Sequence, residues 1–156
     1  MAGESGAYQL ALRLLGRRDH SVAELARKLA ARGHSTTDVN EAVARLTAIG
    51  YLDDQRFAAS FAAAAMRSGR GYGPRLKLEL ARRGVSTEVI TATLAALAEE
   101  QSEGELLAAL VDRRFATFST ATADERERRR VYGYLQRRGF SLAAILEHFR
   151  HSTSSD

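Results

Sequence analysis

The chain has 156 residues, a formal net charge of +4 and an apolar content of 45%, enough to bury the core of one domain or of a few small modules. It contains no cysteine, which excludes disulfides and thiolate metal sites, and its single proline and many Ala, Leu, Arg and Glu residues favour helix over sheet. The sequence shows neither a secretory signal nor an apolar run long enough to span a bilayer, so we expect a soluble cytoplasmic protein.

The first part of the chain, residues 7–52, has the pattern of three helices. The first expected helix covers residues 7–18. Ser21 followed by Glu24 has the spacing of a capping box and predicts the start of a second helix. Apolar residues four positions apart then predict a third helix over residues 36–49.

The most distinctive local sequence comes next and reads Gly50-Tyr51-Leu52-Asp53-Asp54-Gln55-Arg56-Phe57. The glycine suits the end of the preceding helix. The two aspartates suit the cap and first turn of a following helix, where the helix dipole favours carboxylates. Paired aspartates are also cation ligands, although no further carboxylate at close spacing completes such a site.

A glycine-rich segment, Arg70-Gly71-Tyr72-Gly73-Pro74-Arg75, follows the fourth expected helix. Proline fits the first turn of a helix because its missing N–H costs nothing there. The spacing of the glycines matches neither nucleotide-binding fingerprint, so we interpret the segment as a hinge-like turn with a basic rim. A pair of helices follows, and the polar, acidic residues 99–104 are expected to form a flexible boundary. The last part starts a helix at about residue 105, has a Ser/Thr/Ala loop over residues 118–123, and continues with a helix over 124–138.

One short pattern, Leu-x-x-Arg-Gly-x-Ser, occurs three times, at residues 29–35, 80–86 and 135–141. Apolar residues flank each copy at matching positions, which describes two amphipathic helices joined by a tight turn. The glycine is expected to take a positive φ and the serine to cap the next helix. The copies lie about fifty residues apart, so each repeat has room for a third helix. We therefore expect an all-α fold of three tandem three-helix modules, packed in a row, with the boundaries 7–52, 53–100 and 103–151.

Basic residues form two local clusters. The first holds Arg67, Arg70, Arg75, Lys77, Arg82 and Arg83, and the second holds Arg126, Arg128, Arg129, Arg130, Arg137 and Arg138. Two interpretations stay open, a solvated helix face and a surface that meets a polyanion. Under the second interpretation, the candidate partner-binding residues are Arg70, Arg75, Lys77, Arg82, Arg83, Arg126, Arg129 and Arg130.

Features of a catalytic site are not found in the sequence. His148 and His151 have a spacing that a metal site can use, but no carboxylate or thiol set completes it, and chance surface histidines are the simpler explanation. The chain has no nucleophile elbow, metalloprotease motif or Walker loop. We therefore expect no enzyme activity, no metal and no cofactor.

The motifs resemble those of the bacterial RecX family of recombination regulators. The resemblance rests on the segment from Gly50 to Phe57, on Gly73-Pro74, on Arg83-Gly84, and on Ser21 to Leu25, and it covers about residues 7–150, more weakly in the third module. It implies a curved, elongated repeat protein that lodges in the groove of the RecA filament on single-stranded DNA and suppresses its ATPase, strand-exchange and coprotease activities. The family motif residues are expected to be structural: Gly50, Tyr51, Leu52, Asp53, Asp54, Arg56, Phe57, Gly73, Pro74 and Gly84. We expect a monomer with no membrane contact and at most weak direct contact with DNA.

The alternative function is direct, nonspecific DNA binding by a helix-turn-helix repeat protein, because three helix pairs are present. The helix expected over residues 85–97 carries almost no Arg, Lys, Asn or Gln side chains that could read bases. Backbone binding through the two basic clusters stays open.

Overall fold

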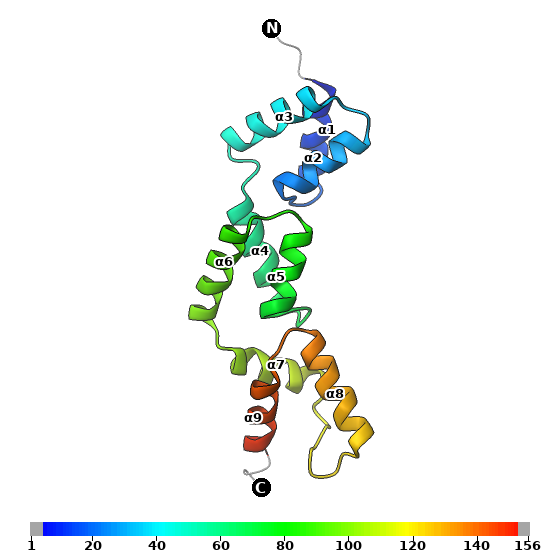
Figure 1. The fold of residues 1–156 in the computed structure, drawn as a ribbon, viewed down its shortest axis with the longest axis vertical. Coiled ribbons are helices and arrows are strands. Elements are labelled where there is room, and N and C mark those ends of the chain that lie inside the picture. The colour runs from blue at the N-terminus through cyan, green and yellow to red at the C-terminus, as the bar shows by residue number, and fades with distance from the viewer. Residues whose placement is uncertain (1–4, 153–156) are drawn as a thin grey trace. The chain divides into compact units, whose positions relative to one another are not determined.

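The computed structural model describes residues 5–152, and these form nine α-helices and no strand (Figure 1). The all-α prediction is confirmed. No helix in this range is long and apolar enough to cross a membrane. The helices are α1 (Gly6–Leu15), α2 (Val22–Ala31), α3 (Thr36–Ala48), α4 (Asp54–Arg67), α5 (Gly73–Arg82), α6 (Thr87–Glu100), α7 (Glu103–Arg114), α8 (Glu125–Arg137) and α9 (Leu142–Ser152).

The repeated Leu-x-x-Arg-Gly-x-Ser pattern forms a helix–turn–helix in each copy. Gly33, Gly84 and Gly139 have φ values of 85°, 79° and 105°, as predicted, because glycine alone takes this conformation without a Cβ clash. The serine two residues later caps the following helix each time. The side-chain oxygens of Ser35, Ser86 and Ser141 accept hydrogen bonds from backbone N–H groups three residues on.

The described residues form two compact units whose boundaries run through α4, α5 and α6. The first unit takes in the chain up to Ser60 together with Glu79–Thr91, and the second takes in Phe61–Leu78 together with the chain from Ala92. The units therefore do not coincide with the three expected modules. The module boundaries, and the elongated, curved arrangement implied by the family resemblance, stay predictions.

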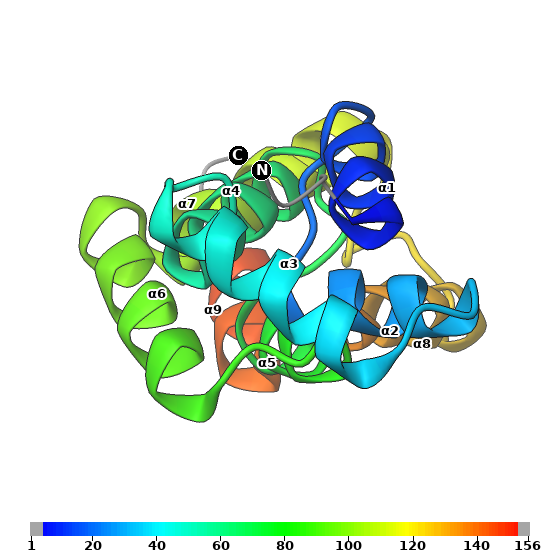
Figure 2. The same cartoon turned by 90° about the horizontal axis from the view of Figure 1, so that it is seen from above.

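The core of the first unit lies among α1, α2 and α3, which pack on one another (Figure 2). Leu25, Leu29 and Leu46 are fully buried there, at 0% exposure, and Leu52 joins them from the segment before α4. Burial of each such leucine contributes about 1.5–3 kcal/mol. The spacing of the leucines in α2 is four residues, so one helix face supplies both.

The Arg-Gly turn of the second repeat, residues 83–84, packs on the start of α2 within the first unit. The Ser21 hydroxyl, which caps α2, also donates a hydrogen bond of 2.5 Å to the Arg83 carbonyl. The Arg83 guanidinium lies 2.7 Å from Glu24, the other member of the capping box. A Cβ on Gly84 would lie only 2.4 Å from the Cβ of Ala23. The turn needs glycine both for its backbone conformation and for this close approach.

A contact at the equivalent position, made by a backbone amide and not by a hydroxyl, occurs in the second unit, one repeat further along the chain. The Tyr72 amide donates a hydrogen bond of 2.7 Å to the carbonyl of Arg138, and a Cβ on Gly139 would lie 1.9 Å from the Tyr72 carbonyl oxygen. Tyr72 precedes Gly84 by the same twelve positions by which Ser21 precedes Gly33. The Arg-Gly turn of each later repeat thus packs on the start of the middle helix of the repeat before it.

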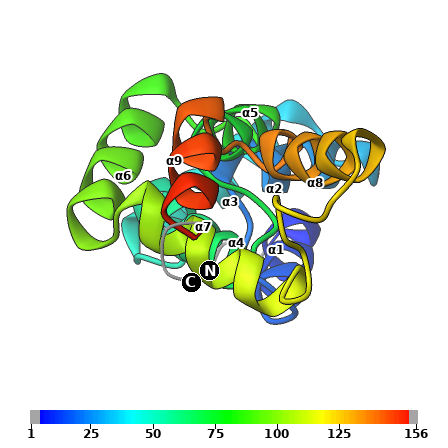
Figure 3. The same cartoon turned by 90° about the horizontal axis from the view of Figure 1, so that it is seen from below.

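The core of the second unit lies mainly among α7, α8 and α9, where α9 packs against both other helices (Figure 3). Leu107, Val131, Leu135 and Ile145 are fully buried in it. The aromatic ring of Phe149 contacts the rings of Tyr132 and Phe118 at centroid distances of 5.5 and 5.2 Å, so two partly buried aromatic residues pack on this core beside it.

Two local expectations need correction. Ser102 and Glu105 form a second complete capping box, so α7 begins at Glu103, and the boundary expected over residues 99–104 is mostly helical. The segment from Arg70 to Arg75 is not a free hinge. Gly71 is buried, and a Cβ on the preceding Gly69 would lie 2.6 Å from Leu110, because α7 packs directly on this turn.

Candidate polyanion-binding surface

A basic surface of the second unit begins at the turn between α4 and α5. The Arg138 guanidinium donates a hydrogen bond of 3.2 Å to the Arg70 carbonyl, and the Arg113 guanidinium donates one of 3.1 Å to the Arg67 carbonyl. These bonds satisfy carbonyls at the end of α4 and in the turn after it, and they hold two positive charges beside the turn. The ring of Tyr72 stacks on Phe140 at 5.1 Å, and burial, with the nearby charge of Glu103, raises the pKa of the Tyr72 hydroxyl.

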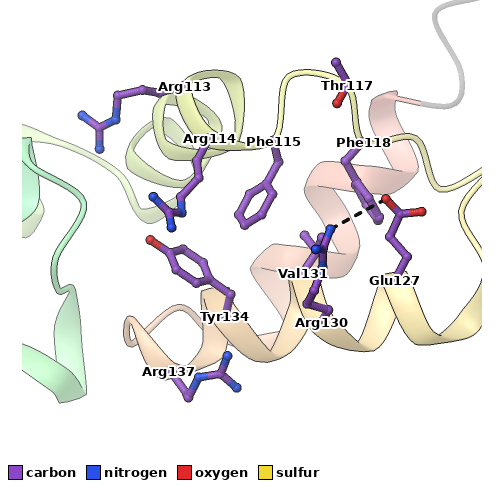
Figure 4. A pocket seen from close by; sticks show the side chains of 10 residues that line it. All are labelled: Arg113, Arg114, Phe115, Thr117, Phe118, Glu127, Arg130, Val131, Tyr134 and Arg137. Atoms are coloured by element: carbon purple, nitrogen blue, oxygen red, sulfur yellow. Dashed lines mark ion pairs between the residues drawn. The ribbon is translucent and has the colours of Figure 1, made fainter.

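The surface continues into a groove of about 560 Å³ between the end of α7, the loop that follows it, and α8 (Figure 4). We call it the basic groove. Four arginines and one carboxylate line it together with aromatic side chains, so its formal charge is strongly positive. The lining residues are Arg113, Arg114, Phe115, Thr117, Phe118, Glu127, Arg130, Val131, Tyr134 and Arg137.

Tyr134 organises the cations at one end of the basic groove. The guanidinium carbons of Arg114 and Arg138 lie 4.9 and 4.8 Å from its ring centroid, within the range of cation–π attraction. Phe115 meets the same ring edge-on at 5.2 Å. Figure 4 shows Arg114, Phe115 and Tyr134 pointing toward one another across the basic groove. Among the described residues, these two guanidinium groups are therefore held beside the ring without a carboxylate partner, and Arg138 is held in addition by the Arg70 carbonyl.

The other end of the basic groove is formed by the loop after α7 and the first turn of α8. The Arg128 guanidinium donates a hydrogen bond of 2.7 Å to the Thr120 carbonyl and so fastens the loop to the helix. Arg130 lies 4.0 Å from Glu127, an exposed pair that contributes little free energy. Arg129 pairs with Glu125 on the outer side of α8.

The structure distributes the candidate partner-binding residues over both units. Arg70, Arg75 and Lys77 lie in the second unit at the turn before α5 and in its first half. Arg82 and Arg83 lie in the first unit, where Arg83 holds Glu24. In the second cluster, Arg130 lines the basic groove, whereas Arg126 and Arg129 lie outside it.

Arg83 has a structural contact because its guanidinium pairs with the partly buried carboxylate of Glu24. Burial alone would raise the pKa of Glu24, but hydrogen bonds from Arg18 and the Ser21 amide, and the charges of Arg18 and Arg83, lower it overall. Beside it, His20 is buried, with its Nδ1 2.9 Å from the Arg18 carbonyl and its Nε2 3.0 Å from the Lys28 ammonium. Burial and the charge of Arg18 lower the pKa of His20.

The motif residues around α4 make contacts inside the first unit. Asp53 accepts a hydrogen bond from the Arg56 amide, and Asp54 accepts one of 2.9 Å from the Val22 amide at the start of α2. The Arg56 guanidinium donates to the Gly50 carbonyl at 2.9 Å, and Leu52 and Phe57 are buried. Tyr51 differs from these, because 57% of it is exposed. Gly73 and Pro74 form the start of α5, and Gly73 has a positive φ of 43°.

Sequence reasoning missed Arg113, Arg114 and Phe115 as members of the basic surface. They follow one another at the end of α7, where basic residues also suit the negative end of the helix dipole, so their local sequence looks purely structural. The aromatic residues of the last repeat are scattered along the chain. They converge only because the loop after α7 folds back against α8.

Comparison with known proteins identifies the family. Models of the first, second and third three-helix domains of RecX match residues 7–46, 53–94 and 101–147. Regulatory protein RecX of Syntrophotalea carbinolica is 38% identical over 149 residues, which are 96% of this chain and 97% of that protein. The chain belongs to the RecX family.

Other RecX relatives agree with this assignment. Regulatory protein RecX of Trichlorobacter lovleyi is 43% identical over 145 residues, covering 93% of this chain and 94% of that protein. The crystal structure of RecX from Lactobacillus salivarius matches with a TM-score of 0.75 at 19% identity, over 97% of both chains. A further crystal structure of regulatory protein RecX matches with a TM-score of 0.71 at 21% identity, covering 93% of this chain and 70% of that one. At such identities the two crystal structures support the RecX fold alone.

Proposed function

We propose that the chain regulates a RecA-type recombinase, mainly as an inhibitor. It binds the groove of the recombinase filament on single-stranded DNA and suppresses the ATPase, strand-exchange and coprotease activities of the filament. The observation that carries the proposal is family membership along nearly the whole chain, since the RecX relatives are named regulatory proteins. The protein acts in the cytoplasm as a monomer and has no catalytic role of its own.

The basic surface of the second unit supports the proposal through its charge. A recombinase filament on DNA presents phosphates and acidic protein patches. A second unit that carries Arg70, Arg75 and Lys77 as well as the basic groove would speed the encounter with such a filament, and the attraction would weaken as salt rises. We assign these three residues, together with Arg82, Arg126, Arg129 and Arg130, to the candidate contact. Arg83 has the ion pair with Glu24 as an additional structural task.

The proposal is tested by the DNA-dependent ATPase of purified RecA after addition of substoichiometric amounts of this protein. We expect inhibition at fewer than one molecule per recombinase subunit, because one bound molecule in a continuous groove obstructs several subunits. The measurement is repeated with a large excess of free single-stranded DNA. Persistent inhibition supports filament binding. Inhibition that the added DNA abolishes shows that free single-stranded DNA takes up this protein, and absence of inhibition without added DNA contradicts the proposed function.

A further inference from the structure

The basic groove has the composition of a site for a phosphodiester chain. Arg113, Arg114, Arg130 and Arg137 face one carboxylate, Glu127, across a volume of about 560 Å³, which is in the size range of small-ligand sites. Within the described part of the chain, neither Arg114 nor Arg137 has a carboxylate within ion-pair distance. Both side chains are exposed. Their positive charge is therefore available to an external anion.

Aromatic side chains lie among these arginines, and a site that binds phosphate alone would not need such rings. Phe115, Phe118 and Tyr134 line the basic groove and are half-buried. The guanidinium carbon of Arg114 lies over the ring of Tyr134, 4.9 Å from its centroid, within the range of cation–π attraction. A flat base could form a stack with this pair, because bases stack on aromatic rings and on guanidinium planes alike.

Single-stranded nucleic acid fits this combination better than an acidic protein segment or a duplex. An acidic segment uses the cations but has no flat groups for the stack. A duplex offers phosphates, but its bases are already stacked inside and cannot reach rings that lie in a groove. An extended single strand presents phosphates and unstacked bases together, and grooves with positive charge and aromatic rings are typical of sites for it.

We propose that this protein by itself binds single-stranded nucleic acid in the basic groove, with Arg114 and Arg137 on phosphates and the stack of Arg114 and Tyr134 against a base. This inference goes beyond the proposed function, because it requires no recombinase. Arg130, held near Glu127, lines the opposite end of the same groove and extends its positive charge along the strand.

The test measures fluorescence anisotropy of the full chain with four labelled probes of matched length and no recombinase present. The probes are oligothymidine, an abasic phosphodiester chain, a DNA duplex and a polyglutamate peptide. We expect oligothymidine to bind at least about tenfold more tightly than the abasic chain, since base stacking adds to the phosphate contacts. Equal affinity for oligothymidine and the abasic chain, or equal or tighter binding of the peptide or the duplex, would overturn the proposal.

Two double variants test whether oligothymidine binds in the basic groove. Arg114→Ala with Arg137→Ala should weaken oligothymidine binding and reduce the slope of log affinity against log salt by about 1.4, from about 0.7 for each lost phosphate contact on a single strand. Arg17→Ala with Arg32→Ala removes the same charge from two exposed residues outside the basic groove and should leave most of the affinity in place. Equal losses in the two double variants would show that the binding is not in this groove.

Arg114→Lys separates charge from stacking. Lysine keeps the positive charge but has no flat guanidinium. The salt slope should stay unchanged while the preference for oligothymidine over the abasic chain falls several-fold. An unchanged preference would show that Arg114 contributes charge alone and would overturn the assigned stack. Circular dichroism and thermal unfolding of each variant establish that the fold is retained.

Discussion

The Arg-Gly turns allow one substitution to be compared at three equivalent places. Gly33, Gly84 and Gly139 share the sequence pattern and a positive φ, so Gly→Ala imposes a backbone strain of at least about 1–2 kcal/mol at each. Their surroundings differ. A Cβ at Gly33 meets nothing within 4 Å, whereas a Cβ at Gly84 meets that of Ala23 at 2.4 Å and a Cβ at Gly139 meets the Tyr72 carbonyl oxygen at 1.9 Å.

Gly139→Ala must push the turn away from Tyr72. The hydrogen bond from the Tyr72 amide to the Arg138 carbonyl, 2.7 Å long, would then be stretched or lost, and a poorly satisfied amide costs about 1–3 kcal/mol. Added to the backbone strain, the expected loss of unfolding free energy is about 2–5 kcal/mol. Gly84→Ala adds about 1–3 kcal/mol of overpacking to the strain. Gly33→Ala should cost only the strain itself.

The assay is urea unfolding of the three variants followed by the helical circular dichroism signal. The expected order of destabilisation places Gly84→Ala and Gly139→Ala well above Gly33→Ala. Gly84→Val, which adds a branched side chain at positive φ, should cost at least about 1 kcal/mol. If the three alanine variants lose the same free energy, the packing of the later turns on the preceding repeat contributes nothing, and the reasoning is refuted.

Three further predictions follow from contacts described above. Charge reversal of Arg70, Arg75 and Lys77 to Glu should raise the protein concentration needed to inhibit the recombinase ATPase and should flatten the salt dependence of the inhibition. Reversal of Arg13, Arg17 and Arg32 in the first unit is the charge-matched control. If the first variant inhibits as well as the unaltered chain, Arg70, Arg75 and Lys77 are not part of the contact. Ser21→Ala should cost about 2–3 kcal/mol of unfolding free energy in a urea titration, because it removes both a helix cap and the hydrogen bond to the Arg83 carbonyl. Ser35→Ala removes a helix cap alone and should cost about 1 kcal/mol. Stability should fall as pH drops below the ordinary His pKa of 6.5, because the pKa of His20 is lowered in the folded state and the unfolded state takes up the proton first. The slope of unfolding free energy against pH is at most about 1.4 kcal/mol per pH unit for one such group. His20→Gln should flatten this slope, and an unchanged slope would assign the effect to other groups.

The sequence is sufficient to predict the helices and their ends where local chemistry determines them. The capping box of Ser21 and Glu24, the serines after each Arg-Gly turn and the positive φ of the three glycines all depend on residues within a few positions of one another. The start of α7 lies two residues before the predicted one, at the capping box of Ser102 and Glu105. That signal is present in the sequence, but the acidic residues around it favour a flexible boundary and obscure the helix start.

The candidate site could be predicted only in part, because it depends on contacts between distant segments. The arginines of α8 stand out as a run, but the basic groove also needs Arg114 and Phe115 from the end of α7, which a loop separates from α8. Arg82 and Arg83 belong to the first cluster in sequence, yet they lie in a different compact unit from Arg70. The sequence therefore predicts which short segments are basic, but the fold determines which basic residues share a surface.

The packing of each Arg-Gly turn on the preceding repeat has a consequence for dividing the chain into fragments. A cut between α6 and α7 would leave the Tyr72 amide without the Arg138 carbonyl, and a cut between α3 and α4 would separate Ser21 from the Arg83 carbonyl. Each compact unit is assembled from two separate stretches of chain, so no single cleavage releases either one whole. A fragment holding the first repeat alone would keep the core among α1, α2 and α3 but would lose the contacts of Ser21 and Glu24 with Arg83, so a fragment of two consecutive repeats should be more stable.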